Sequence, residues 1–173
     1  LADHDRALEI DPNLAEAWNH RGLARQAAGD VDGAIADFSR ALELEPGHFV
    51  IWLNRGTVRA AKGQFDAGIS DLTRAIEING LSAQAWSMRG RIRGMKGDYD
   101  GTVAYGCRPI EIDPNRASVW NGRGTARAAK GDLDGAMTDW TRAIEADPGY
   151  ASAWSNRGLA RASKGDIAGA LAD

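Results

Sequence analysis

The chain has 173 residues, enough for one domain or one short array of repeats, and 43% of them are hydrophobic. Its 21 basic and 24 acidic residues give a net charge of −3, which argues against binding to nucleic acid or to an acidic membrane surface. No apolar run approaches the roughly eighteen residues of a membrane-spanning helix. One cysteine and three histidines exclude an internal disulfide and leave little for metal chemistry, so we expect no metal and no cofactor.

Two kinds of break recur along the chain with a period of 34 residues. The first is a turn signal that precedes a tryptophan, and these tryptophans are Trp18, Trp52, Trp86, Trp120 and Trp154. The turn signals are Asp11-Pro12-Asn13, Glu45-Pro46-Gly47, Asn79-Gly80-Leu81, Asp113-Pro114-Asn115 and Asp147-Pro148-Gly149. The second break contains Gly29, Gly63, Gly97, Gly131 or Gly165 and divides each period into two segments of helical length. Each period is therefore predicted to be a helical hairpin.

The first predicted helix covers residues 15–28 and places Trp18, Gly22 and Arg25 along one face. The second segment repeats helical spacing at Ala34, Phe38, Ala41 and Leu42, and Asp30 and Asp32 are available to cap or charge-stabilise its start. The small residues Gly22 and Ala34 allow the two helices to cross closely. The later periods repeat this plan in the same order.

These residues resemble the tetratricopeptide repeat, whose pattern is Trp-x2-Leu-Gly-x2-Tyr, then Ala-x3-Phe, then Pro. Trp18, Gly22, Ala34, Phe38, Ala41 and Pro46 match the first copy, and the resemblance extends over five successive copies. It implies an all-α, right-handed α-solenoid of antiparallel helix pairs whose first helices line a concave groove that binds peptides or proteins. We expect residues 1–173 to be a single array, with the end of a truncated repeat at 1–14, full repeats at 15–48, 49–82, 83–116 and 117–150, and a truncated fifth repeat at 151–173.

The chain departs from the family pattern by carrying arginine in place of the usual leucine and tyrosine. The pairs lie four residues apart: Arg21 and Arg25, Arg55 and Arg59, Arg89 and Arg93, Arg123 and Arg127, Arg157 and Arg161. The second helices offer carboxylates with the same period, at Asp3, Asp37, Asp71, Asp139 and Asp173. We predict that one arginine of each pair meets such an aspartate, and we favour this ion-pair ladder over a basic strip for an acidic ligand.

The third copy breaks the pattern, because Ala104-Tyr105-Gly106-Cys107-Arg108-Pro109 replaces Ala36-Asp37-Phe38-Ser39-Arg40-Ala41. It loses the aspartate, the aromatic residue and the close-packing alanine together. Proline inside a helix costs about 3 kcal/mol, so we expect the helix to kink or stop between Tyr105 and Arg108. A hinge or a bulge that exposes Cys107 and Tyr105 is one interpretation, and a degenerate repeat or a local sequence error is the favoured alternative.

No catalytic pattern stands out in the sequence. Gly122-Arg123-Gly124-Thr125-Ala126-Arg127 begins like a dinucleotide-binding loop but lacks the final glycine and lies within a predicted helix. Cys107 has no predicted partner to activate it, and the tryptophans are explained by core packing. We therefore expect a protein that is not an enzyme.

The resemblance also assigns the ligand-facing positions of the first helices, which differ between copies while the framework does not. Only Arg91 supplies a cation there, around an apolar centre at Val50, Leu53, Met88 and Met95. A segment with apolar anchors and one acidic group near Arg91 is the expected ligand, and a merely solvated face is the alternative. The expected groove residues are Glu16, Asn19, Leu23, Val50, Leu53, Asn54, Thr57, Gln84, Ser87, Met88, Arg91, Met95, Asn121, Thr125, Ser155 and Leu159.

Leu1-Ala2-Asp3 and Leu171-Ala172-Asp173 repeat the same three letters at the same phase of the period. We therefore expect a piece of a longer array, in which head-to-tail stacking of copies is a further hypothesis and an arbitrary boundary is its alternative. The compartment is unknown from the sequence, with the cytoplasm favoured. The leading function is a protein-protein interaction scaffold that binds a peptide or protein. A docking or regulatory segment of a larger enzyme and a self-assembling array are the alternatives.

Overall fold

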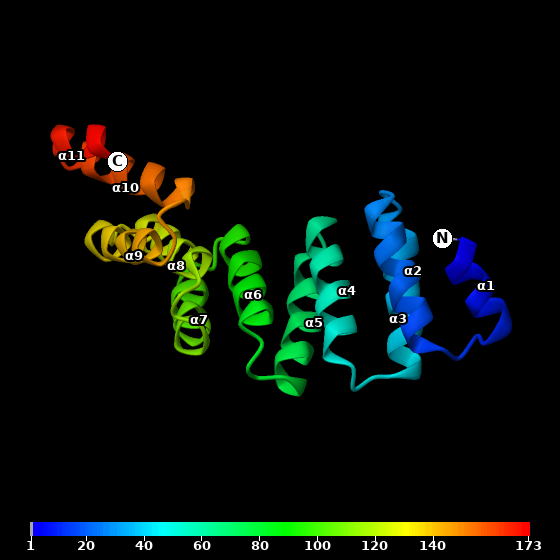
Figure 1. Ribbon diagram of the computed structural model, residues 1–173. Coiled ribbons are helices and arrows are strands. Elements are labelled where there is room, and N and C mark those ends of the chain that lie inside the picture. The colour runs from blue at the N-terminus through cyan, green and yellow to red at the C-terminus, as the bar shows by residue number, and fades with distance from the viewer. Residues whose placement is uncertain (1) are drawn as a thin grey trace. The chain divides into compact units, whose positions relative to one another are not determined.

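The computed structural model describes residues 2–173, except for the side chain of Tyr105. Helices account for all the regular secondary structure of the described residues, and no strand occurs among them. Their order (Figure 1) is α1 (Ala2–Ile10), α2 (Ala15–Ala27), α3 (Val31–Leu44), α4 (Phe49–Ala61), α5 (Phe65–Ile78), α6 (Ala83–Met95), α7 (Tyr99–Ile112), α8 (Ala117–Ala129), α9 (Leu133–Ala146), α10 (Ala151–Ser163) and α11 (Ile167–Ala172).

The helices pack in pairs within two compact units, residues 1–81 and residues 82–173. In the first unit α2 packs on α3 and α4 on α5, and in the second α6 packs on α7, α8 on α9 and α10 on α11. We call α2, α4, α6, α8 and α10 the first helices, and α3, α5, α7, α9 and α11 the second helices. The helical hairpins predicted from the 34-residue period are confirmed.

Each first helix is followed by a glycine whose backbone adopts the left-handed conformation. Gly29 has a φ of +84°, which few other residues adopt without strain. The N–H of Asp30 reaches back to the carbonyl of Arg25 at 2.9 Å and closes the end of α2. The carboxylate of Asp30 then accepts a hydrogen bond from the N–H of Gly33 at 2.9 Å, so the predicted cap at the start of α3 is confirmed.

A large residue on the second helix fills the space between neighbouring first helices. Phe38 is fully buried, and a Cβ atom added to Gly22 of α2 would lie only 2.7 Å from its ring. Trp140 plays the same part in the second unit, where a Cβ on Gly124 would lie 2.9 Å from the indole nitrogen. Glycine at this phase of the first helix is therefore required by close packing, as the sequence predicted.

Helix α7 corrects one part of the expectation for the third copy, namely that the helix stops. It runs from Tyr99 to Ile112 and has 14 residues, as do α3, α5 and α9, so it does not stop between Tyr105 and Arg108. Pro109 is fully buried at the phase of Ala41, and its carbonyl accepts the N–H of Asp113 at 2.8 Å. Packing against the neighbouring helices keeps the chain helical despite the proline. The predicted exposure of Tyr105 concerns a side chain outside the described residues.

Candidate functional site

A stack of tryptophan, arginine and aspartate recurs in the helix pairs. The indole nitrogen of Trp18 donates to the carbonyl of Pro12 at 2.9 Å, and the guanidinium of Arg21 lies 4.6 Å from the centroid of that ring. Arg21 also donates through Nε and Nη2 to the two oxygens of Asp37, at 2.9 and 2.8 Å. These contacts tie the turn, the first helix and the second helix together.

The predicted ion-pair ladder is confirmed, and both arginines of a pair take part in it. Asp71 accepts from Arg55 at 2.9 Å through each oxygen and from Arg59 at 2.9 Å. The same geometry joins Arg25 to Asp37, Arg123 and Arg127 to Asp139, and Arg157 and Arg161 to Asp173. These arginines therefore serve the fold, which removes the interpretation of a basic strip for an acidic ligand.

The ladder differs from the prediction at two places. Asp3 is exposed and contacts no arginine among the described residues, and Arg21 meets Asp5 instead, at 2.8 Å. In the third copy Tyr105 occupies the aspartate phase, and Arg93 pairs with Asp98 at 3.2 Å.

The ladder also shifts the acid–base properties of its members. Hydrogen bonds to Asp37 raise the pKa of Arg21 above its ordinary value, and those to Asp139 raise the pKa of Arg123. Hydrogen bonds from Arg157 lower the pKa of Asp173. All three shifts favour the charged forms of the paired groups.

The expected groove residues divide by exposure. Asn19 and Leu53 are buried, at 8% and 5% exposure. The half-buried ones are Val50, Asn54, Thr57, Ser87, Met88 and Asn121. The exposed ones are Glu16, Leu23, Gln84, Arg91, Met95, Thr125, Ser155 and Leu159.

Asparagine pairs join neighbouring first helices. The side-chain nitrogen of Asn54 on α4 donates to the oxygen of Asn19 on α2 at 3.1 Å. Asn156 on α10 donates to Asn121 on α8 in the same way, at 3.0 Å. We call this contact line the asparagine seam. Because Asn19 and Asn54 bind each other, their amides are partly satisfied before any ligand arrives.

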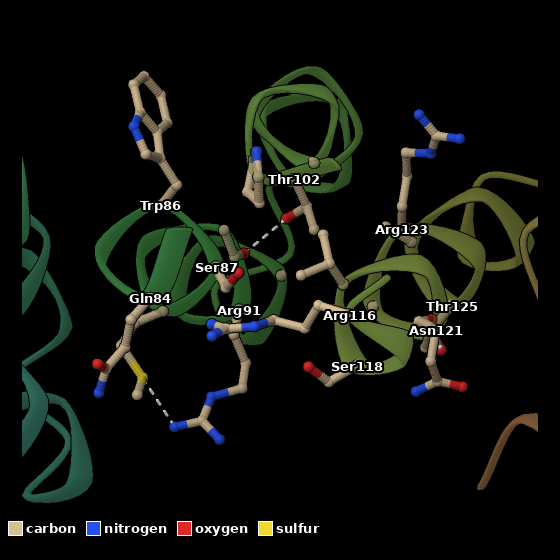
Figure 2. A pocket seen from close by; sticks show the side chains of 18 of the residues that line it. Gln84, Trp86, Ser87, Arg91, Thr102, Arg116, Ser118, Asn121, Arg123 and Thr125 are labelled. Atoms are coloured by element: carbon tan, nitrogen blue, oxygen red, sulfur yellow. Dashed lines mark hydrogen bonds between the residues drawn. The ribbon is translucent and has the colours of Figure 1, made fainter. Parts of the chain in front are cut away.

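A cavity of about 610 Å³ lies in the second unit among α6, α7 and α8. Figure 2 shows side chains of α6 and α8 on its sides, with Thr102 of α7 donating to the carbonyl of Gly90 at 3.0 Å. The expected groove residues that line it are Gln84, Ser87, Met88, Arg91, Met95, Asn121 and Thr125. The structure therefore brings together the expected residues of α6 and α8 around one hollow.

Sequence reasoning missed the contribution of the second helix to this hollow. Gly106 and Pro109 of α7 line it, together with Arg116 and Val119 at the start of α8. The signal was present in the sequence, because Gly106 stands at the phase of Phe38. A missing side chain predicts a cavity only when the neighbouring helices do not close over it, and the sequence does not show that.

Other chemistry finds little support in the described part of the chain. No group of three or more histidine, cysteine or acidic side chains lies close enough to hold a metal ion there. Gly122 to Arg127 lie within helix α8, as predicted, so they form no phosphate-binding loop. Cys107 is exposed, and its sulfur lies 3.6 Å from Nη1 of Arg123. Among the same residues, none of the helices has the length and apolar character needed to cross a bilayer.

Two segments match family models, residues 15–48 the tetratricopeptide repeat and residues 124–165 the TPR repeat. The chain is a tetratricopeptide-repeat protein. This TPR protein also shares its fold with the crystal structure of MamA, at 24% identity and a TM-score of 0.81 over 87% of this chain and 88% of that one. MamA 41-end from Desulfovibrio magneticus RS-1 is 14% identical, with a TM-score of 0.83 over 91% and 89% of the two chains.

A third similar structure is YrrB, described as a TPR protein with an unusual peptide-binding site. It is 22% identical to this TPR protein, with a TM-score of 0.78 over 97% of this chain and 87% of that one. No curated protein matched the sequence. The matches establish an α-solenoid of helix pairs, as predicted, and the repeat family supports a role as a protein-interaction scaffold.

Proposed function

We propose that this TPR protein is a non-enzymatic scaffold that binds a peptide or protein segment along the face of its first helices. In this proposal residues 1–173 act as one array, with the repeat boundaries predicted from the sequence. The family supports binding of proteins in general. The choice of this face rests on the residues that the fold leaves unused.

One observation carries the proposal: the first helices expose large apolar side chains that the framework does not use. Leu23 of α2 is 39% exposed, Met95 of α6 is 62% exposed and Leu159 of α10 is 69% exposed. Exposed apolar side chains are costly to hydrate, so each of these three can anchor an apolar group of a ligand. Methionine adapts readily to different ligand shapes.

The charges on this face indicate the kind of segment that binds. Outside the third copy the ladder arginines are bound to aspartates with buried side chains, whereas Arg91 is exposed and its hydrogen-bond partner among the described residues is the sulfur of Met88, at 2.9 Å. A thioether is a weak acceptor and leaves the charge of Arg91 uncompensated. We infer a ligand with apolar anchors and one acidic group, in agreement with the expectation from the sequence.

Peptide display on the intact chain tests the proposal. Peptides selected from a random library should bind Met95→Glu about tenfold more weakly than the wild type, because the change places a charge on the apolar face. Ile10→Glu is the matched control, since Ile10 is 73% exposed but belongs to α1. Equal binding by both variants and the wild type would contradict the proposal. Light scattering of the same samples reports any association of the chain with itself.

A further inference from the structure

The cavity among α6, α7 and α8 occupies the place of a missing core residue. Phe38 in α3, Leu72 in α5 and Trp140 in α9 are almost fully buried at this phase, but α7 carries Gly106. In the first pair the ring of Phe38 covers Gly22, whereas a Cβ atom added to Gly90 of α6 would meet nothing within 4 Å. The space beside Gly90 is therefore open in the third pair, while the Cβ position of Gly106 faces the side-chain stem of Arg123.

The asparagine seam is also interrupted beside this cavity. Ser87 on α6 occupies the repeat position of Asn19 and Asn121, and Gly122 on α8 occupies the repeat position of Asn54 and Asn156. The asparagine pair found between α2 and α4 and between α8 and α10 is therefore missing between α6 and α8. A Cβ on Gly122 would meet nothing within 4 Å, and Gly122 is exposed. The hydroxyl oxygen of Ser87 is buried without a hydrogen-bond partner, which is costly for a polar atom. The cavity thus reaches the first-helix face at Gly122, beside the buried hydroxyl of Ser87.

The lining is cationic as well as apolar. It includes Arg91, Arg116 and Arg123 and no acidic residue. Arg123 is bound to Asp139, and Arg116 lies 3.3 Å from Asp113, so the uncompensated charge belongs to Arg91. An anionic group on a ligand would meet this charge at the edge of the cavity.

We propose that this cavity is a binding site for an aromatic ring that carries a carboxylate. The ring takes the open space beside Gly90, where the other helix pairs have a large core side chain, and the carboxylate meets Arg91. The volume falls within the roughly 300–1,000 Å³ of small-molecule sites, and a dry cavity of about 150 Å³ already admits benzene. The ligand is either a free aromatic acid or an aromatic residue next to a carboxylate on a bound segment.

The test is a titration of the isotope-labelled chain with 3-(indol-3-yl)propionate, followed by amide chemical shifts. Gly106→Phe should fill the cavity and weaken binding about tenfold or more, since it removes the space for the ring. Arg91→Ala should weaken binding of the acid up to about fivefold while leaving the neutral amide of the same compound unaffected, because the arginine acts on the charge. Gly47→Phe is the matched control, because a Cβ there would meet nothing within 4 Å and the residue lies in an exposed turn.

Gly106→Phe crowds Arg123, because a Cβ at Gly106 would lie 3.1 Å from Cγ of Arg123. A second variant therefore keeps the test valid if Gly106→Phe does not fold. Ser87→Asn with Gly122→Asn restores the seam found between α2 and α4 and should also block the probe. Unchanged affinity in a folded cavity-filling or seam-restoring variant would overturn the inference, as would equal binding of propionate, which has no ring.

Competition distinguishes the two sources of the ligand. If a display-selected peptide is displaced by the probe and weakened by Gly106→Phe, the ring belongs to a bound segment. If the probe binds and depends on Gly106 but does not displace any selected peptide, the ligand is a free aromatic acid. The inference can be tested separately from the proposed function. If no peptide is selected, the proposed function fails, but the titration with 3-(indol-3-yl)propionate still tests the cavity.

Discussion

At the scale of single residues, the ladder aspartates are the most consequential polar groups of the molecule. Asp71 has a side chain that is only 3% exposed and accepts hydrogen bonds from two arginines. Arg55 and Arg59 are themselves largely covered, at 12% and 23% exposure. Removal of the carboxylate would leave two poorly hydrated charges facing each other, which is far more costly than the loss of an exposed ion pair.

We therefore expect Asp71→Asn to lower the free energy of unfolding by about 3 kcal/mol. Glu77→Gln is the control, because Glu77 and Arg74 form an exposed pair that contributes less than about 1 kcal/mol. Urea denaturation followed by circular dichroism measures both. Similar losses in the two variants would show that the ladder contributes no more than the surface charges.

At the scale of the element, helix α7 keeps its length while it gives up the side chains that stabilise its counterparts. Ala41, Ala75 and Ala143 are fully buried at the phase of Pro109, so alanine fits this position without strain. The proline removes a backbone N–H and crowds the preceding turn. The helix therefore persists through tertiary packing rather than through its own propensity.

Pro109→Ala should consequently raise the free energy of unfolding by about 1–3 kcal/mol, since it restores a backbone donor within α7. The reverse change in α9, Ala143→Pro, should lower it by about 3 kcal/mol or more. Thermal and urea unfolding of the two variants provide the comparison. A loss of stability in Pro109→Ala would mean that the proline is needed for the packing of α7.

The third copy also shows where sequence reasoning stops. The period, the helix pairs and the ladder follow from residue spacing, because Arg55 and Asp71 recur at matching phases and unpaired charges are not tolerated there. The uninterrupted course of α7 and the cavity beside Gly106 depend on how α6 and α8 pack around it. Local propensity predicts that the helix kinks or stops between Tyr105 and Arg108, and tertiary contacts keep it from stopping there.

At the scale of the whole molecule, the chain combines a repeated framework with a variable face. The same tryptophan, arginine and aspartate stack ties Trp18 and Trp154 into their helix pairs, whereas the exposed positions of the first helices differ from copy to copy. Within each of the two units, contacts inside the helix pairs and between neighbouring pairs stabilise the framework, and the variable residues do not take part in the stack. The resemblance to the repeat family predicts that the first helices form the binding face. The cavity at α6 and α8 was found only in the structure.

Chemical-shift mapping with a display-selected peptide tests the central claim most directly, because it reports every backbone amide of the chain at once. The account predicts the largest changes on the first helices, around Met88, Arg91 and Asn121, and little change at Arg40 and Arg142 on the exposed side of α3 and α9. Changes confined to the second helices, with α6 and α8 unaffected, would contradict binding along the first-helix face.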